Sequence, residues 1–460
     1  MTRSSCVTAT VLLLTMAGAA RPHSQDAAPA AAASSLTQVN IPGFGDRYNS
    51  ISWSMLWWRG RLYVGTSRAA FCLRVLGWHD AYPPSDPDVE CTPDRADLPL
   101  AAEIWRYTPD PGGWELVYRA PTDLPYPGRP GKFIARDIGY RDMIAFREPD
   151  GTEALYVSGV SARFLPGALP PPRLLRSTDG VTFEPVPQDR GTVLGDLDAN
   201  NFRSLAVFRD KLYVTAGSIW GDGPLYESAN PAAGNNTFRL VTPPGMRVFS
   251  IEVFDNQLYV GTTDVAGGWG IYRTTGLGSA PYTFVPVVTG AAHHPGEPSL
   301  PTSVISFETF NGSLYAGTDG LGDVVRVHAD DTWDLIVGAP RATPAGFRVP
   351  LSGLGGGFNW SGNVLIWRMA VHDGALFIGT FDSSSFLKEN LVLGPILRPH
   401  MGAKMYATRD GRFFRVLAYN SFDGDFLNYG IRTFASTPYG LFIGTANEWY
   451  GTEVWRLVTQ

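Results

Sequence analysis

The sequence predicts an all-β protein, a β-propeller with seven blades, from its composition and from an internal repeat. The chain of 460 residues contains 51 glycines, 36 prolines and 12% aromatic residues, which is typical of many short strands joined by turns. Charged residues make up only 17%, which disfavours a coiled coil or long helical bundle, and 44% hydrophobic residues exclude a disordered chain. A strand-like motif then recurs seven times along the chain.

The motif has five residues: leucine, an aromatic residue, one small or β-branched residue and, in most copies, a final Gly-Thr. Its β-branched and aromatic content predicts a strand. The copies are Leu62–Thr66, Leu155–Gly159, Leu212–Ala216, Leu258–Thr262, Leu314–Thr318, Leu376–Thr380 and Leu441–Thr445. A short apolar strand and a tight turn precede each copy, and two further strands follow. We therefore expect four-stranded antiparallel blades, with strands A to D and the motif as strand B.

The two ends of the chain predict how the propeller closes. After the last motif, Glu453–Arg456 supplies a strand C, and the chain ends at Gln460 without a strand D. Near the N-terminus, Leu36–Ile41 resembles a strand D with no blade of its own. We expect this strand to complete the last blade, so that residues 36–460 form one propeller domain with protected sheet edges.

The N-terminus predicts export. Residues 1–20 carry Arg3, an apolar centre at Val11–Leu14 and small residues at Ala17–Ala20, the pattern of a signal peptide. The apolar run is too short for a membrane span, and an Ala/Pro-rich linker follows at residues 21–35. We expect a secreted or periplasmic monomer with no membrane span. The net charge of −6 disfavours a nucleic-acid partner.

Two cysteines remain after removal of the signal peptide, Cys72 and Cys91. In an exported protein we expect them to form a disulfide, because disulfides persist in that environment. The alternative is two free thiols in an exported loop.

Two predicted turns resemble those of a known class of propellers. Ser177–Phe183 reads Ser-Thr-Asp-Gly-Val-Thr-Phe, and Ala407–Phe413 follows it more loosely. These segments resemble degenerate sialidase-type (Asp-box) repeats of exported bacterial β-propellers, although Asp and Gly are adjacent here rather than separated by one residue. The resemblance covers turns in two blades and implies the fold. It carries no active-site residues, and the blade count departs from the sialidase pattern.

Long connections are predicted to gather on one face of the propeller. They are residues 67–102 and 381–403, both between strands B and C, and the links 119–139 and 338–363 between blades. Such loops on a rigid scaffold usually carry binding or catalysis. Neutral loop growth is the alternative, but it would lengthen turns on both faces, and only residues 147–154 do so on the other.

Aligning the seven predicted A strands places arginines and tryptophans at the mouth of the axial channel. The residues are Arg141, Arg203, Arg368, Arg432, Trp53 and Trp367. One interpretation is an internal set of ion pairs with Asp142 and nearby loop acids, since unpaired buried charge is costly. The other is a ligand site in which arginines bind a carboxylate, sulfate or phosphate and tryptophans stack on a sugar.

Asparagines recur just before several A strands, at Asn49, Asn363 and Asn428. They either cap turns by bonding their own backbone or present amides to ligand hydroxyls.

The candidate catalytic residues are Asp142, Asp382 and His400. Asp382 follows a strand-B threonine, and two carboxylates on this face could act as general acid and base. His400 is a candidate by its place in the long 381–403 loop. No histidine or cysteine has metal-ligand spacing, and Asp196 and Asp198 match a calcium loop only weakly, so we expect no metal and no cofactor, with calcium as the minor alternative.

Two functions follow. The first is an exported propeller that binds an anionic carbohydrate at the channel mouth and, if it is an enzyme, cleaves it as a glycoside hydrolase or polysaccharide lyase. The second is a non-catalytic propeller that binds a small molecule or a protein with the same face. Propellers support both functions, so only the geometry of the site can decide between them.

Overall fold

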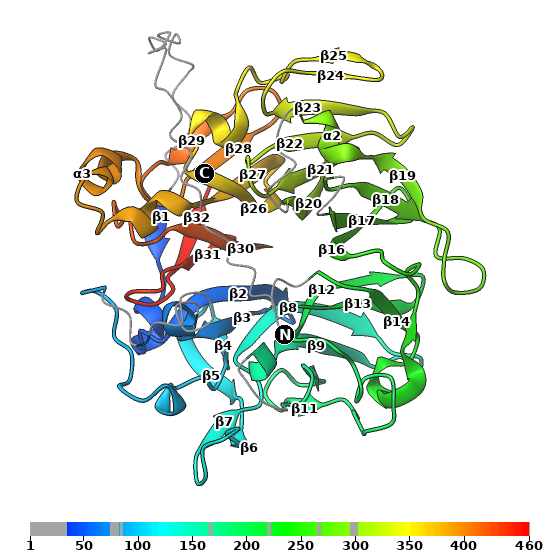
Figure 1. Ribbon diagram of the computed structural model, residues 1–460, viewed down its shortest axis with the longest axis vertical. Helices are drawn as coiled ribbons and strands as arrows, with labels where there is room; N and C mark the ends of the chain where they lie inside the picture. The colour runs from blue at the N-terminus through cyan, green and yellow to red at the C-terminus, as the bar shows by residue number, and fades with distance from the viewer. Residues whose placement is uncertain are drawn as a thin grey trace, which may run out of the picture.

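The computed structural model describes residues 35–73, 82, 86–164, 169–218, 222–264, 268–294 and 302–459. These residues form mostly β-strands, arranged around a central axis (Figure 1). The predicted signal peptide and residues 21–34 of the predicted linker lie outside the described residues.

Each copy of the repeated motif forms the second strand of an antiparallel hairpin. The seven hairpins are β2 (Asn49–Trp58) with β3 (Arg61–Arg68), β8 (Gly139–Arg147) with β9 (Glu153–Val160), β12 (Asn201–Phe208) with β13 (Lys211–Gly217), β16 (Val248–Phe254) with β17 (Gln257–Asp264), β20 (Thr302–Phe310) with β21 (Ser313–Thr318), β26 (Asn363–His372) with β27 (Ala375–Asp382), and β30 (Gly430–Thr437) with β31 (Gly440–Ala446).

The first strands of these hairpins contact one another in chain order, and β30 contacts β2 to close the cycle. Figure 1 looks along the resulting axis, with the first strands nearest the centre and later strands of each sheet toward the rim. The fold is therefore mostly β and propeller-like.

Third and fourth strands extend each hairpin outward. The third strands are β4 (Glu103–Thr108), β10 (Leu174–Ser177), β14 (Leu225–Ser228), β18 (Ile271–Thr274), β22 (Val324–Val327), β28 (Met405–Thr408) and β32 (Val454–Val458). The fourth strands are β5 (Gly113–Arg119), β11 (Glu184–Pro185), β15 (Arg239–Leu240), β19 (Val285–Val288), β23 (Trp333–Val337), β29 (Arg415–Ala418) and β1 (Ser35–Gln38). The strand β1 pairs with β32, placing Leu36 opposite Leu457, so the N-terminal strand completes the C-terminal sheet as predicted.

The recurring glycine of the motif has a steric cause. A Cβ on Gly65 would lie 2.4 Å from the Ser54 hydroxyl and 2.7 Å from the Cβ of Tyr140, which lies on the first strand of the next hairpin. In the last hairpin, a Cβ on Gly444 would lie 2.3 Å from the Ser52 hydroxyl. The first strand of the next sheet thus packs directly on this glycine, and a larger residue would push the two sheets apart.

The two Asp-box-like turns share one geometry. Asp179 Oδ1 accepts hydrogen bonds from the backbone N–H groups of Val181 and Thr182, both at 2.8 Å. Asp410 Oδ1 accepts the equivalent bonds from Arg412 and Phe413, at 2.8 and 2.9 Å. These backbone bonds hold the pKa of Asp179 well below its usual range, so the aspartate stays ionised and fixes the turn.

The connections between these strands contain the remaining elements. These are η1 (Pro42–Gly45), η2 (Arg95–Asp97), β6 (Thr122–Pro125), β7 (Phe133–Ala135), η3 (Ala162–Phe164), η4 (Pro231–Ala233), η5 (Asn235–Thr237), α2 (Gly290–His293), β24 (Arg341–Thr343), β25 (Gly346–Arg348), η6 (Gly356–Asn359), η7 (Ser383–Leu387), α3 (Leu393–Leu397) and η8 (Arg398–His400). Cys72 and Cys91 form the predicted disulfide, which links the two sides of the connection between β3 and β4.

Candidate functional site

Every first strand has a β-bulge at the equivalent position, where one or two of its residues have no paired residue on the second strand of the hairpin. The skipped residues are Trp53, Arg141, Arg203 with Ser204, Phe249, Ile305, Trp367 and Arg432. We call the seven residues Trp53, Arg141, Arg203, Phe249, Ile305, Trp367 and Arg432 the bulge ring. A bulge releases one residue from the ladder and re-aims its side chain. Five of the six residues predicted at the channel mouth belong to this ring.

The arginines of the bulge ring pack on aromatic rings of neighbouring strands. The Arg141 guanidinium lies 5.1 Å from the ring centroid of Trp53, and that of Arg432 lies 5.4 Å from that of Trp367. Arg203 lies 3.5 Å from the ring centroid of Phe249, within cation–π range. The predicted arginines and tryptophans therefore come together, but as stacked pairs between adjacent sheets.

The bulge ring contains three arginines and no acidic residue. Within the described part of the chain, neither Arg141 nor Arg432 has an ion-pair partner, and the Nε atom of each is buried without a hydrogen bond. Burial lowers the pKa of Arg141 to about 10. Burial also lowers the pKa of Arg203 and of Arg432, and their arginine neighbours lower both further. Such a cluster of arginines favours the binding of an anion.

One acid lies near Arg203. Asp319 follows β21, and its carboxylate accepts a hydrogen bond from the backbone N–H of Ser303. Burial raises the pKa of Asp319 to about 7, while Arg203 acts in the opposite direction. The internal ion-pair interpretation therefore has support at Arg203 from the charge of Asp319 and at Arg432 from the charge of Asp142, and none at Arg141 in the residues described.

Asp142, a predicted catalytic residue, links two sheets. Its Oδ1 accepts a hydrogen bond from the N–H of Met143 at 2.9 Å, and its Oδ2 accepts one from the N–H of Leu205 on β12 at 2.8 Å. Serines make the equivalent link elsewhere; Ser306, for example, donates to the carbonyl of Ile366 at 2.7 Å. Burial raises the pKa of Asp142, and Arg368 opposes the rise.

A cavity of about 470 Å³ occupies the channel between the bulges and the turns that join first and second strands. We call it the axial chamber. All seven first strands line it, and Met55, Trp57, Phe307 and Phe434 supply much of its apolar wall. Its charged lining residues are Asp142, Glu252, Glu308 and Arg368. Arg368, predicted at the mouth with the other arginines, thus faces the chamber rather than belonging to the bulge ring.

Sequence reasoning missed Glu252 and Glu308. They occupy the same aligned position on the neighbouring strands β16 and β20, where the other first strands carry Leu56, Ile144, Ala206, Ala370 and Ala435. Burial raises the pKa of Glu308 to about 8, with the charge of Glu252 adding to the rise and Arg368 opposing it. Burial also raises the pKa of Glu252. Two carboxyls in an otherwise apolar row were the signal that could have revealed them.

The other predicted catalytic residues, Asp382 and His400, meet at Lys404. The Lys404 ammonium donates to Asp382 Oδ2 and to the His400 carbonyl, both at 2.7 Å. Asp382 also accepts from the Trp360 indole at 3.0 Å and caps η7 through the N–H of Ser384 at 2.8 Å. Asp382 and Lys404 are fully buried, with side-chain exposure of 0% each. Neither Asp382 nor His400 lines the axial chamber with Asp142.

The predicted ligand-binding asparagines are buried and bonded within the protein. Asn49 donates to Glu103 at 2.8 Å and to the Gly43 carbonyl at 3.0 Å. Asn363 donates to the Gly357 carbonyl at 2.9 Å, and Asn428 donates to Glu453 at 2.8 Å. Asn49 and Asn363 thus bond backbone carbonyls in the loops that lead into their first strands, in line with the capping interpretation, whereas Asn428 bonds a glutamate side chain 25 residues further along the chain.

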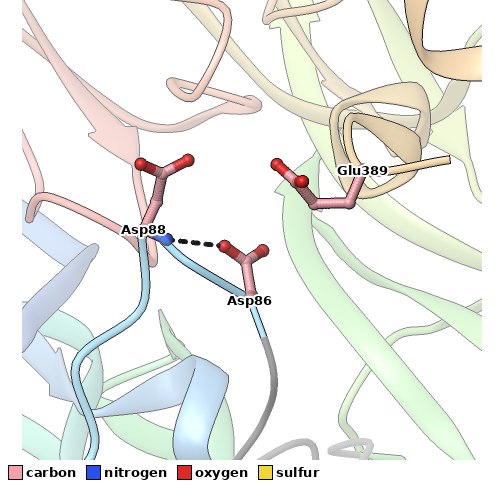
Figure 2. A group of neighbouring side chains, drawn as sticks. All are labelled: Asp86, Asp88 and Glu389. Carbon is pink, nitrogen blue, oxygen red and sulfur yellow. Dashed lines mark hydrogen bonds between the residues drawn. The ribbon is translucent and has the colours of Figure 1, made fainter. Parts of the chain in front are cut away.

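Three carboxylates gather where the two largest loop insertions meet, as Figure 2 shows for Asp86, Asp88 and Glu389. Their spacing would suit a cation. The Lys388 ammonium already fills that role, donating to all three carboxylates at 2.7 to 2.9 Å. The cluster therefore ties the connection after β3 to η7 and the residues that follow it.

Comparisons with known proteins give no family assignment. No family model matches the chain, and no curated protein matches it. Among solved structures, streptogramin B lyase matches at a TM-score of 0.49 and 9% identity, covering 92% of this chain and 98% of that one. A puromycin hydrolase matches at 0.48 and 12%, covering 90% of this chain and 54% of its own. A GH74 xyloglucanase from Xanthomonas campestris matches at 0.42 and 16%, with the same coverage of 90% and 54%.

These structures are β-propeller-type folds. This chain spans about half the length of the puromycin hydrolase and xyloglucanase chains. At these identities and scores, none of the matches assigns a substrate or a reaction. In the described part of the chain, no helix has the length and apolarity that a membrane span requires.

Proposed function

We propose that the chain is an exported seven-bladed β-propeller that binds an anionic carbohydrate at its bulge ring. The seven hairpins with their outer strands count as seven blades in this proposal. The observation that carries it is the set of buried arginines, of which Arg141 and Arg432 have no ion-pair partner in the described residues. A carboxylate or sulfate would supply the missing charge and hydrogen bonds.

The aromatic members of the ring support a sugar as the rest of the ligand. Trp53 and Trp367 are only partly buried, and each already packs on an arginine. Arginine held on an aromatic face loses less side-chain freedom when it binds a planar anion. Sugar rings present C–H faces that pack on exposed indole surface.

The geometry favours binding over cleavage. A glycosidase needs two carboxyl groups on either side of the scissile bond. The predicted candidates are divided between two places, because Asp142 lines the axial chamber while Asp382 is buried against Lys404. Non-catalytic binding is therefore the form of the proposal we favour, with hydrolysis or elimination as the alternative that the experiment also tests.

The test is calorimetric titration of the full chain with uronate-containing, sulfated and sialylated oligosaccharides, together with an assay for released reducing ends. We expect at least one anionic ligand to bind and its neutral counterpart not to bind. Arg432→Ala should weaken binding about tenfold or more, the loss of one charge-assisted contact. Arg412→Ala, at an exposed turn position, is the matched control. Absence of binding to every anionic glycan, or equal affinity in Arg432→Ala, would overturn the proposal.

A further inference from the structure

The axial chamber has the size of a site for a small organic molecule. Its volume of about 470 Å³ falls within the range of small-molecule pockets and far exceeds the space of one metal ion. Among the described residues, the only acidic group spaced to hold a metal is Asp86, Asp88 and Glu389, so the chamber carboxyls are not arranged around a single ion. An occupant must therefore reach between separated polar groups in a cavity that both polar and apolar residues line.

The chamber is chemically distinct from the bulge ring. Three of its four charged residues are acids, Asp142, Glu252 and Glu308, and its only cationic residue is Arg368. Asp142 is already held by two backbone N–H groups. Glu252 accepts one bond, from the N–H of Val253 at 2.9 Å, and no cation lies within ion-pair distance of Glu252 or Glu308 in the described residues.

Two neighbouring carboxyls with no cation within ion-pair distance in the described residues are costly to ionise, and an ammonium group would relieve that cost. The aromatic walls add to this preference. Trp57, Phe307 and Phe434 line the same chamber. Aromatic faces attract alkylammonium groups, whose charge is weakly hydrated and whose methyl groups also pack on apolar surface.

We propose that the axial chamber is a second binding site, which takes a compact organic ammonium cation beside Glu252 and Glu308. The site differs from the bulge ring in both position and charge, so the two proposals can fail separately. Arginines occupy the level of the bulges, and the glutamates lie beyond them toward the turns between first and second strands.

Binding of a cation should expel a proton. Burial and the charge of Glu252 raise the pKa of Glu308 to about 8, so Glu308 is mainly protonated at neutral pH. The groups that act on it from neighbouring strands are Glu252 on β16 and Arg368 on β26, and Asp142 on β8 acts on Glu252. A cation favours ionised Glu308, so affinity should rise with pH up to about 8 and then level off.

The experiment titrates the full chain with choline, whose charge does not change with pH, and with its uncharged carbon analogue 3,3-dimethylbutan-1-ol. We expect choline to bind and the alcohol to bind at least tenfold more weakly. Choline affinity should increase about 30-fold from pH 6.5 to pH 9, the ratio of ionised Glu308 at those two values. Heats measured in buffers of different ionisation enthalpy should show proton release below pH 8.

Variants separate a ligand site from a structural role. Glu308→Gln and Glu252→Gln keep the side-chain shape and should each weaken choline binding about tenfold or more, and Glu308→Gln should abolish the pH dependence. Thr309→Ala, an exposed neighbour on the same strand, is the matched control and should bind as the unmodified chain does. Thermal unfolding confirms that each variant is folded. Equal binding of the two probes, no binding of choline, or unchanged affinity in Glu308→Gln would overturn the proposal.

Discussion

Replacing Glu308 with glutamine should remove a large part of the pH dependence of folding stability. The usual pKa of a glutamate is about 4.5, and in the axial chamber burial and Glu252 raise the pKa of Glu308 to about 8. Between these two values the folded state keeps a proton that the unfolded chain has lost. The free energy of unfolding therefore falls as pH rises through this window, and it is independent of this group below pH 4.5 and above pH 8.

The size of the effect follows from the width of the window. The interval from 4.5 to 8 spans about 3.5 pH units at about 1.4 kcal/mol each, or about 5 kcal/mol in total. Glutamine resembles the protonated glutamate, so Glu308→Gln should match the unmodified protein near pH 4. It should become more stable than the unmodified protein by about 5 kcal/mol near pH 9.

The assay is urea unfolding of the unmodified protein, Glu308→Gln and the exposed control Thr309→Ala at pH values from 4 to 9. Asp319 and Glu453, whose pKa values burial raises to about 7, also make stability fall with pH, but they are present in all three proteins and cancel in the differences. Curves for the unmodified protein and Glu308→Gln that run parallel from pH 4 to 9 would refute the placement of Glu308 in a poorly solvated chamber.

Two further predictions concern the closure of the ring and the loop cluster. Leu36→Ala should lower the free energy of unfolding by about 1 to 2 kcal/mol in thermal unfolding, since Leu36 on β1 packs into the last sheet. Thr37→Ala, at an exposed position on the same strand, should change it little. Equal effects of the two substitutions would contradict closure through β1. Lys388→Met should lower stability by about 1 to 3 kcal/mol and make the melting temperature rise with added calcium, because three carboxylates would then lack their shared ammonium. Lys132→Met, at an exposed ion pair, is its control, and a calcium response in the unmodified protein would count against the role of Lys388.

The repeat predicted the fold well because its residues do the same physical work in each copy. Leu62, Tyr63 and Val64 each expose 1% or less of their surface to solvent, and the following Gly65 leaves room for the first strand of the next sheet. The alignment of first strands also found the bulge ring, since the skipped residue falls at the same offset each time. The sequence repeat therefore predicted those structural features that recur in every sheet.

The features that sequence reasoning missed are departures from the repeat. Glu103 at the start of β4 and Glu453 just before β32 accept hydrogen bonds from Asn49 and Asn428, whereas the equivalent position before β28 holds Lys404. That exchange of a glutamate for a lysine explains why Asp382 is a buried counterion. Loop residues such as Asp86 and Lys388 meet only in the folded chain, 302 residues apart, and no local pattern predicts their contact.

The arrangement of charge along the axis is the strongest reason to expect ligands there. A propeller that needed only to fill its channel could carry residues such as Ile305 at every bulge and alanine at every glutamate position, as Ala370 and Ala435 do. Buried like charges oppose folding, and replacing them with apolar residues is often stabilising. Three of the axial arginines lie at the bulges, away from the glutamates, and Arg368 shares the chamber with the glutamates without coming within ion-pair distance of either in the described residues. Arg141 and Arg432 without an ion pair at the bulges, and two carboxyls with raised pKa in the chamber, are difficult to explain by stability, and they are what sites for two oppositely charged ligands would require.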